Sequence, residues 1–264
     1  EIEALRRYLL RETLVGRTVV DVDVDWPGVE DTVDGMGGLS GLPGRRIEEI
    51  DRRGKQLVVQ MDRGFLGLHM GMTGRLGIMS PDDPSFRYCR VTMYLDDERR
   101  IELDDVRRWA MVRLEEHAEE FTRGLGPDAL DPDFTAEVFA ERVSHRRSPI
   151  KSVLLDQHVL AGVGNIYADE ALLLVGISPS RRADRISAGR LEALHGEIVV
   201  VLENALAFIE SHPDEYGRPY VVDAHDDRMQ IPRQAGAPCP QCDTPLKSKK
   251  FGGRTAYFCA ACQR

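Results

Sequence analysis

The sequence lacks the features that mark membrane and secreted proteins. No run approaches the roughly 20 uninterrupted apolar residues that cross a bilayer, and the first residues, Glu1-Ile2-Glu3, carry acid where a signal peptide carries base. Cysteine is scarce: five residues, four of them in two close pairs near the end, do not suit a disulfide framework. We therefore expect a soluble cytoplasmic protein with no membrane partner.

A net positive charge is missing as well. The formal charge is −9 at pH 7, and phosphate binding depends on lysine and arginine, so the total charge argues against a nucleic-acid partner. The basic residues are nevertheless clustered, notably at Arg107-Arg108 and from Lys247 to Arg254. A basic face on an acidic body and an ordinary solvated surface both fit this distribution.

The hydrophobic period changes once along the chain of 264 residues. From about Arg17 to Val112, alternation with period two between glycine-containing turns predicts antiparallel hairpins packed as a β-sandwich. A short helix over Ile2 to Arg11 precedes them, and its apolar face is expected to contain Ile2, Leu5, Leu9 and Leu10. Beyond Gly124 the period is helical, with helices expected at residues 135–143, 150–157, 165–175 and 187–211.

The predicted fold class is therefore α+β, divided into three domains. An N-terminal β-sandwich with its short leading helix occupies residues 1–115, a helical domain occupies residues 126–220, and a small finger occupies residues 235–264. The stretch from Pro213 to Ala237 has no strong period and many proline, glycine and charged residues, which predicts a linker or a mobile loop.

The finger is predicted from four cysteines. Cys239-x2-Cys242-x16-Cys259-x2-Cys262 has the spacing of a zinc ribbon, in which two knuckles complete a closed tetrahedron around one structural ion. Between the knuckles we expect a β-hairpin whose turn carries Lys247, Lys249, Lys250 and Arg254, a basic finger suited to phosphates. A protein-interaction ribbon with a solvated basic turn is the alternative.

One segment carries a specific resemblance. Asp156-Gln-His-Val-Leu-Ala-Gly-Val-Gly-Asn-Ile-Tyr-Ala-Asp-Glu-Ala171 resembles the helix-two-turn-helix of the formamidopyrimidine-DNA glycosylase and endonuclease VIII family. Gly162 and Gly164 allow a tight turn close to a phosphate, and Asn165 offers its amide at a helix N-terminus. The resemblance implies that Asn165 and Lys151 bind the DNA backbone, whereas a plain helix cap is the alternative.

Two further segments resemble the family's base-extrusion loops. In His69-Met-Gly-Met-Thr-Gly-Arg-Leu76, the resemblance places Met72 in the gap left by an extruded base, whereas we expect Met70 to pack in the core. Asp105-Val-Arg-Arg-Trp-Ala110 is similar to the family's Asp-Pro-Arg-Arg-Phe-Gly. This match implies that Arg108 contacts phosphate or the orphaned base and that Trp109 is an aromatic wedge. The changes at Val106 and Ala110 are expected to loosen or reshape the loop.

Single residues complete the match, which runs from Glu1 to Gln263. The resemblance assigns Lys55 to a phosphate contact near the lesion and to proton transfer during strand cleavage. It assigns Arg254 to the grip on the phosphates that flank the flipped nucleotide. Lesion preference stays open, because the chain departs from the family at Tyr88-Cys89-Arg90 and at Gln230-Ile-Pro-Arg-Gln234 and is short between His212 and Asp227.

The family's nucleophile is an N-terminal proline, in the motif Pro-Glu-Leu-Pro-Glu-Val-Glu. Glu1-Ile2-Glu3 aligns with its last three residues, so the proline and its neighbouring glutamate precede the printed sequence. We expect the natural chain to carry them. Glu1 is not nominated as a substitute nucleophile, and the role of Glu3 is open.

The resemblance implies a bifunctional enzyme of base excision repair. Such an enzyme is a DNA-formamidopyrimidine glycosylase-like hydrolase with DNA-(apurinic or apyrimidinic site) lyase activity, which acts on duplex DNA containing oxidised bases or abasic sites through an imine and β,δ-elimination. We expect it to act as a monomer on the bacterial nucleoid. Two alternatives are a non-catalytic binder of damaged or abasic DNA and a zinc-ribbon interaction protein unrelated to repair.

Overall fold

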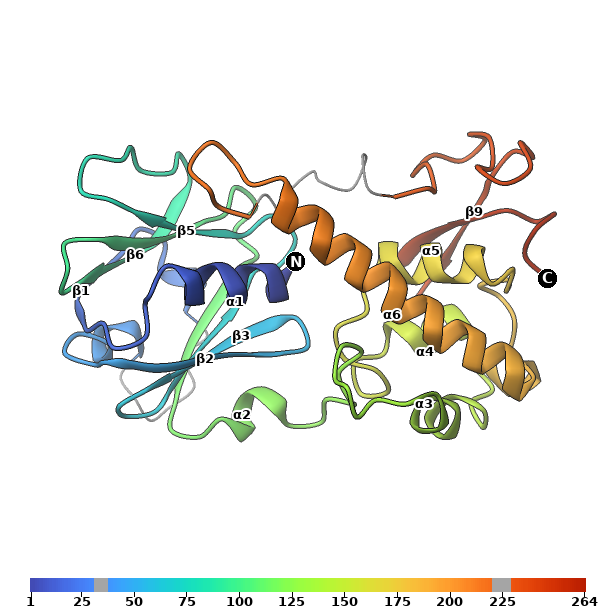
Figure 1. Ribbon diagram of the computed structural model, residues 1–264, viewed down its shortest axis with the longest axis horizontal. Helices are drawn as coiled ribbons and strands as arrows, with labels where there is room; N and C mark the ends of the chain where they lie inside the picture. Colours follow the sequence, from blue (N-terminus) through green and yellow to red (C-terminus); the bar gives the residue numbers. More distant parts are fainter. Residues whose placement is uncertain (31–37, 220–228) are drawn as a thin grey trace. The chain divides into compact units, whose positions relative to one another are not determined.

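The computed structural model describes residues 1–30, 38–219 and 229–264. The chain forms two compact units (Figure 1): Glu1–Arg123 with Ile209–Asp223, and Gly124–Phe208 with Ala224–Arg264. Compactness alone does not show which parts fold independently, so the division into three domains at residues 1–115, 126–220 and 235–264 stays a prediction.

The first unit is built on two four-stranded antiparallel sheets, with strand orders β1-β6-β7-β5 and β2-β3-β4-β8. The predicted sandwich is thereby confirmed. Its strands are β1 (Val19–Val24), β2 (Ile47–Arg53), β3 (Gln56–Met61), β4 (Phe65–His69), β5 (Arg75–Met79), β6 (Cys89–Leu95), β7 (Arg100–Asp104) and β8 (Met111–Glu115). Short helical turns lie at η1 (Pro27–Val29), η2 (Gly38–Gly41) and α2 (Glu119–Thr122).

Helix α1 (Ile2–Arg11) has the predicted bounds but not the predicted face. Its buried residues are Ala4, Leu5, Tyr8 and Leu9, whereas Leu10 is exposed. A helix turns about 100° per residue, so Leu10 points roughly 140° away from Leu5, and Tyr8 takes the inner position. Figure 1 shows α1 lying between the two sheets, where the Tyr8 hydroxyl accepts a hydrogen bond of 3.2 Å from Ile78 N.

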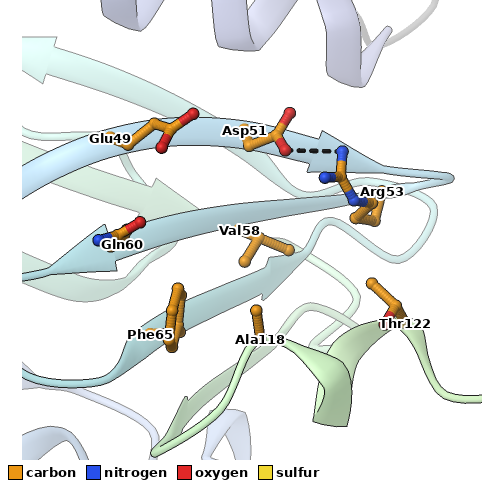
Figure 2. A pocket seen from close by; sticks show the side chains of 8 residues that line it. All are labelled: Glu49, Asp51, Arg53, Val58, Gln60, Phe65, Ala118 and Thr122. Carbon is orange, nitrogen blue, oxygen red and sulfur yellow. Dashed lines mark ion pairs between the residues drawn. The ribbon is translucent and has the colours of Figure 1, made fainter. Parts of the chain in front are cut away.

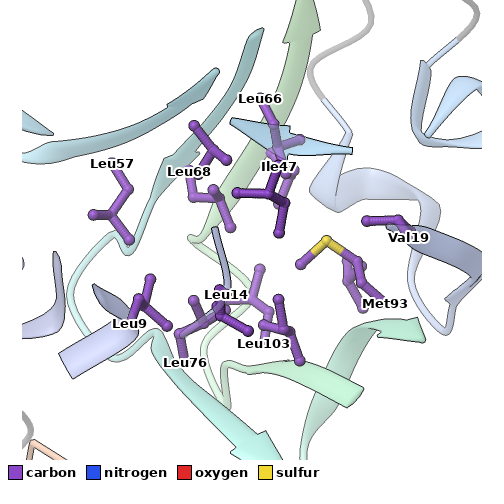
Figure 3. Close-up of a cluster of buried hydrophobic side chains, with 14 of the residues drawn as sticks. Leu9, Leu14, Val19, Ile47, Leu57, Leu66, Leu68, Leu76, Met93 and Leu103 are labelled. Atoms are coloured by element: carbon purple, nitrogen blue, oxygen red, sulfur yellow. The ribbon is translucent and has the colours of Figure 1, made fainter. Parts of the chain in front are cut away.

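The inner faces of the sheets and α1 share one apolar core (Figure 3). In most strands alternate residues point into it, as the period of two requires, whereas register shifts interrupt the alternation in β1 and β2. Its members include Leu9, Leu14, Ile47, Leu57, Leu68, Met93 and Leu103. Met70 is 6% exposed and belongs to this cluster, which confirms its predicted place in the core.

The second unit contains the helices and the finger. The helices are α3 (Ala136–Val143), α4 (Ile150–Leu155), α5 (Asn165–Leu174), η3 (Ala183–Arg185) and α6 (Ala188–Ser211), and the finger hairpin is β9 (Lys247–Phe251) and β10 (Arg254–Phe258). The predicted helices are confirmed, with α4 two residues shorter than expected because Asp156 has left the helical conformation. Gly176, at a left-handed φ of +64°, follows the end of α5.

Two expectations concern segments only partly described. The predicted linker from Pro213 to Ala237 and the short stretch between His212 and Asp227 both include residues 220–228, which lie outside the described residues. Within the described part, Ile231 is buried and its N–H donates to the Glu170 carboxylate on α5, so the end of this segment is anchored. None of the helices in the described ranges is long and apolar enough to cross a membrane.

Candidate nucleic-acid interface

The four cysteines of the finger converge on one point. Their Sγ atoms all lie within 4.8 Å of one another, with 3.5 Å between Cys242 and Cys259 and 4.0 Å between Cys239 and Cys262. A tetrahedron with Zn–S bonds of about 2.3 Å has S···S edges of roughly 3.8 Å. Cys239 and Cys259 are buried and come from different knuckles. The set fits one structural zinc ion.

The finger hairpin presents basic residues beside this zinc site. Its turn is formed by Gly252 and Gly253, both at positive φ, which side-chain-bearing residues rarely adopt. Arg254 follows this turn and is exposed. The three lysines lie along β9 and not in the turn as expected, because the strand extends to Phe251; they are Lys247, Lys249 and Lys250, all exposed.

The turns of the helix-two-turn-helix segment lie between α4 and α5. Gly162 has a φ of +94°, which the turn requires. The Gln157 side chain holds this turn together: its Oε1 accepts from Gly162 N at 3.0 Å, and its Nε2 donates to Val163 O at 3.1 Å. Sequence reasoning assigned no role to Gln157.

Asn165 is the first residue of α5, as predicted, and its amide is oriented by the finger. Its Nδ2 donates to Thr255 O of β10 at 2.9 Å. An amide nitrogen carries two hydrogens, so one further donor is available beside the N–H groups of the helix N-terminus. This arrangement suits a phosphate.

Lys151 does not lie where the resemblance implied. The side chain is fully buried, and Nζ lies 2.7 Å from Asp169 Oδ1 and donates to Asn165 O. Asp169 also pairs with Arg233 at 2.5 Å and accepts from Tyr257 N at 3.2 Å. The charge of Lys151 is already neutralised inside the protein, which argues against the expected contact with DNA; the DNA-binding role of Lys151 stays a prediction. We call Lys151, Asp169 and Arg233 the charged cluster.

Lys55 and His69 lie near each other at one end of the second sheet. Lys55 is half-buried in the β2–β3 turn, and the next residue, Gln56, pairs with His69 across the strands. Burial, and then the charge of Lys55, lowers the pKa of His69. The Nδ1 atom of His69 accepts from Gly71 N at 3.1 Å, so a neutral ring carries its proton on Nε2. Sequence reasoning assigned no role to His69, although it begins the quoted motif.

The two loops expected to enter DNA expose their apolar tips. Met72 is 62% exposed and Trp109 is 46% exposed, which is unusual for side chains of this size and hydrophobicity. The Arg107 guanidinium lies 3.9 Å from the centre of the Trp109 ring. Arg108 is also exposed and has a left-handed φ of +59°.

A separate cavity of about 190 Å³ lies against the second sheet (Figure 2). Its polar lining includes Glu49 and the ion pair of Asp51 with Arg53, at 2.6 Å. No predicted site residue lines it, and carboxylates repel phosphate, so this cavity does not belong to the interface.

Comparisons with known proteins agree with this geometry. Residues 1–112 match the model of the formamidopyrimidine-DNA glycosylase N-terminal domain, residues 125–213 match the formamidopyrimidine-DNA glycosylase H2TH domain, and residues 236–264 match the zinc finger found in FPG and IleRS. The formamidopyrimidine-DNA glycosylase of Herpetosiphon aurantiacus is 35% identical over 272 residues, covering all of this chain and 98% of the relative. That of Geobacillus kaustophilus is 32% identical over 273 residues, with the same two coverages.

Solved structures of formamidopyrimidine-DNA glycosylases align with the whole of this chain. The Lactococcus lactis Fpg (MutM) in complex with DNA containing FAPY-dG aligns with a TM-score of 0.84 and 26% identity, over all of this chain and 98% of that one. A Lactococcus lactis Fpg complex with abasic-site DNA aligns with a TM-score of 0.85 at the same identity and coverages.

The sandwich, the helix-two-turn-helix and the zinc finger together define a nucleic-acid-binding protein of the helix-two-turn-helix class. The three domain models cover most of the sequence, and the relatives match along nearly their whole length. The chain belongs to the formamidopyrimidine-DNA glycosylase family.

Proposed function

We propose that this protein is a bifunctional DNA glycosylase and abasic-site lyase of base excision repair, which acts on duplex DNA carrying oxidised bases or abasic sites. The observation that carries the proposal is that a member of this family has both exposed apolar loop tips, Met72 and Trp109, and phosphate donors, Asn165 and Arg254. The similar Lactococcus lactis structures contain FAPY-dG DNA and abasic-site DNA. We further propose that the protein works as a monomer in the bacterial cytoplasm, at the nucleoid.

Each binding residue has a physical role in this proposal. The second Nδ2 hydrogen of Asn165 and the N–H groups at the start of α5 donate to phosphate, and Arg254 supplies the matching charge from the finger. Trp109 and Met72 fill the space left by the extruded nucleotide. Arg108 contacts phosphate or the orphaned base. His69 offers Nε2–H as a neutral donor beside Lys55.

The proposed chemistry uses the amine of an N-terminal proline, whereas the printed sequence begins at Glu1. In the proposed reaction, the secondary amine of an N-terminal proline attacks C1′, the glycosidic C–N bond breaks, and the base leaves with a proton. The C1′–O4′ bond of the sugar then breaks, O4′ takes up a proton, and the resulting protonated imine between the proline nitrogen and C1′ acidifies the sugar carbons. Loss of a proton from C2′ expels the 3′ phosphate, and loss of a proton from C4′ expels the 5′ phosphate. Lys55 holds phosphate at the lesion and assists these proton transfers, and Arg254 grips the flanking phosphates.

Borohydride trapping tests this proposal. The chain is made with Met-Pro-Glu-Leu-Pro placed before Glu1, and the initiator methionine is removed so that the proline is N-terminal. With abasic duplex DNA, reduction of the imine then gives a covalent protein–DNA adduct. The matched control carries alanine in place of that first proline and is expected to trap poorly, because its primary amine lacks the native geometry.

Two other results would replace the proposal. Tight binding to abasic DNA without trapping would make the protein a non-catalytic binder of damaged DNA. Retention of DNA affinity when both Asn165 and Arg254 are changed to alanine would favour a zinc-ribbon interaction protein unrelated to repair.

A further inference from the structure

We infer that Asp105 is a positioning residue that couples the two base-extrusion loops, so that Met72 and Trp109 enter DNA as one unit. The inference rests on the proposed function and deepens it. The two loops are residues 70–74, between β4 and β5, and residues 105–110, between β7 and β8.

The Asp105 carboxylate organises the whole of its own loop. The side chain is fully buried. Its Oδ2 accepts from Trp109 N at 2.5 Å and from Ala110 N at 2.7 Å, and its Oδ1 accepts from Arg107 N at 3.1 Å. Three backbone donors on one carboxylate fix the loop conformation, including the left-handed Arg108.

Two hydrogen bonds also fix the backbone of Asp105. Its N–H donates to Tyr88 O at 3.0 Å, and its carbonyl accepts from Arg90 Nε at 2.9 Å. Arg90 is itself buried. The carboxylate is therefore a fixed point of the sandwich and not part of a freely moving tip.

The same carboxylate reaches the other loop. The Thr73 hydroxyl donates to Asp105 Oδ1 at 2.5 Å, one residue from the exposed Met72. The two loops also touch at Gly71, where an added Cβ atom would lie 2.7 Å from Trp109 O. Gly71 has a φ of +60°, so both its conformation and its contact exclude a side chain. A displacement of one loop must therefore be shared by the other.

The braced loop contains two departures from the family motif. Val106 and Ala110 stand where the family has proline and glycine, residues that set loop geometry by themselves. Hydrogen bonds to Asp105, a residue that the family motif also contains, hold the loop here, and Ala110 is buried with its N–H on the carboxylate. The expectation that the changes at Val106 and Ala110 loosen or reshape the loop stays a prediction.

A double-mutant cycle tests the coupling in the full chain. Dissociation constants are measured for duplex DNA containing a tetrahydrofuran abasic analogue, with the parent, Met72→Ala, Trp109→Ala and the double variant. Each substitution raises the dissociation constant by some factor. In the parent background, we expect the factor for the double variant to be about fivefold smaller than the product of the two single factors. In a Thr73→Val background, which removes only the hydroxyl, and in an Asp105→Asn background, we expect the losses to multiply to within about twofold.

A fluorescence measurement separates positioning from folding. We expect 2-aminopurine placed beside the analogue to show at least about twofold less unstacking with Thr73→Val than with the parent, at saturating protein. The matched control is Asp104→Asn, because Asp104 is an adjacent, buried carboxylate that bonds Tyr88 N and Arg75 instead of the loops. We expect this control to keep both the coupling and the unstacking, even where its melting temperature falls.

The outcomes distinguish failure of the proposed function from failure of this inference alone. Failure of the parent to prefer the analogue over undamaged duplex overturns the proposed function, and this inference with it. If the parent prefers the analogue while the losses caused by the two single substitutions simply multiply, the inference alone is overturned. The inference is also overturned alone if the coupling is unchanged in the Thr73→Val and Asp105→Asn backgrounds.

Discussion

Replacing Lys151 with methionine should destabilise the protein without removing a DNA contact. Methionine keeps the length and flexibility of the side chain but deletes its charge. Both ends of the Lys151–Asp169 pair are buried, with 0% and 1% of the side chains exposed. Deleting one partner of a buried ion pair costs about 3–5 kcal/mol. Asp169 retains Arg233 at 2.5 Å and Tyr257 N at 3.2 Å, so we expect the lower end, about 3 kcal/mol.

Calorimetry and salt titration measure the two parts of this prediction. A loss of about 3 kcal/mol lowers the melting temperature by roughly 6–12 °C. The slope of log Kd against log salt should stay within about 0.3 of the parent value, because no phosphate contact is lost. Arg254→Ala is the matched control: it should leave the melting temperature nearly unchanged and reduce the magnitude of the slope by about 1.

A second variant compares the stability contributions of two residues of the charged cluster. Asp169→Asn removes the carboxylate that Lys151 and Arg233 share, so its loss of stability should equal or exceed that of Lys151→Met. The reasoning is refuted if Lys151→Met keeps the parent melting temperature while its salt slope falls by about 1, since that pattern belongs to a surface phosphate contact.

Three shorter predictions follow from the rest of the site. Removal of zinc by a chelator, or Cys242→Ser, should unfold the finger and open residues 236–264 to protease; an unchanged digestion pattern would contradict a structural metal. Trp109→Ala should lower kcat/KM on a base-paired lesion by at least about fivefold while Trp109→Phe keeps most activity, since loss of one stacked aromatic costs about 1–3 kcal/mol; equal losses in both would exclude stacking. For Glu3, burial opposes ionisation, but hydrogen bonds from Arg6 and Arg7 outweigh it and lower the pKa to about 2. The stabilisation is therefore present above the unfolded pKa of about 4.3 and is lost as pH falls towards 2, so Glu3→Gln should melt earlier at pH 7 and converge with the parent near pH 2; a pH-independent difference would sink this account.

The sequence predicted the elements well where a periodic pattern coincided with a local stop signal. Asn165 follows two glycines and starts α5, and Gly176 follows its end, so both bounds were close to the predicted ones. The face of α1 was less predictable. Tyr8 is apolar over most of its ring, and its hydroxyl needs a partner when buried; Ile78 N supplies one, which only the fold reveals.

The candidate site was predictable in position and less so in function. Exposed Met72 and Trp109 lie on loops, and exposed Arg254 is the first residue of β10, directly after the hairpin turn, so a motif match and surface exposure go together at these positions. Lys151 belongs to an equally good match, yet the structure buries it, because Asp169 lies on the neighbouring helix with its carboxylate at hydrogen-bond distance. Pairing across helices depends on tertiary packing, which a single sequence does not encode locally. The same applies to Asp105, whose partner Thr73 lies 32 residues earlier in the chain.

The net charge of −9 is a total for the whole chain and does not describe how charge is distributed over the surface. Several acidic groups are partnered within the protein, Asp169 by two cations, Glu3 by three arginines and Asp105 by backbone donors, but the cations among these partners are already counted in that total. Exposed cations remain where DNA is proposed to bind, along β9 and in the loop of residues 105–110. The local potential at a surface depends on the charges nearest to it, because salt screens the others beyond about 10 Å. An acidic protein can therefore carry locally basic surfaces. Its affinity for DNA should fall as the salt concentration rises, and more steeply the more phosphates these surfaces neutralise.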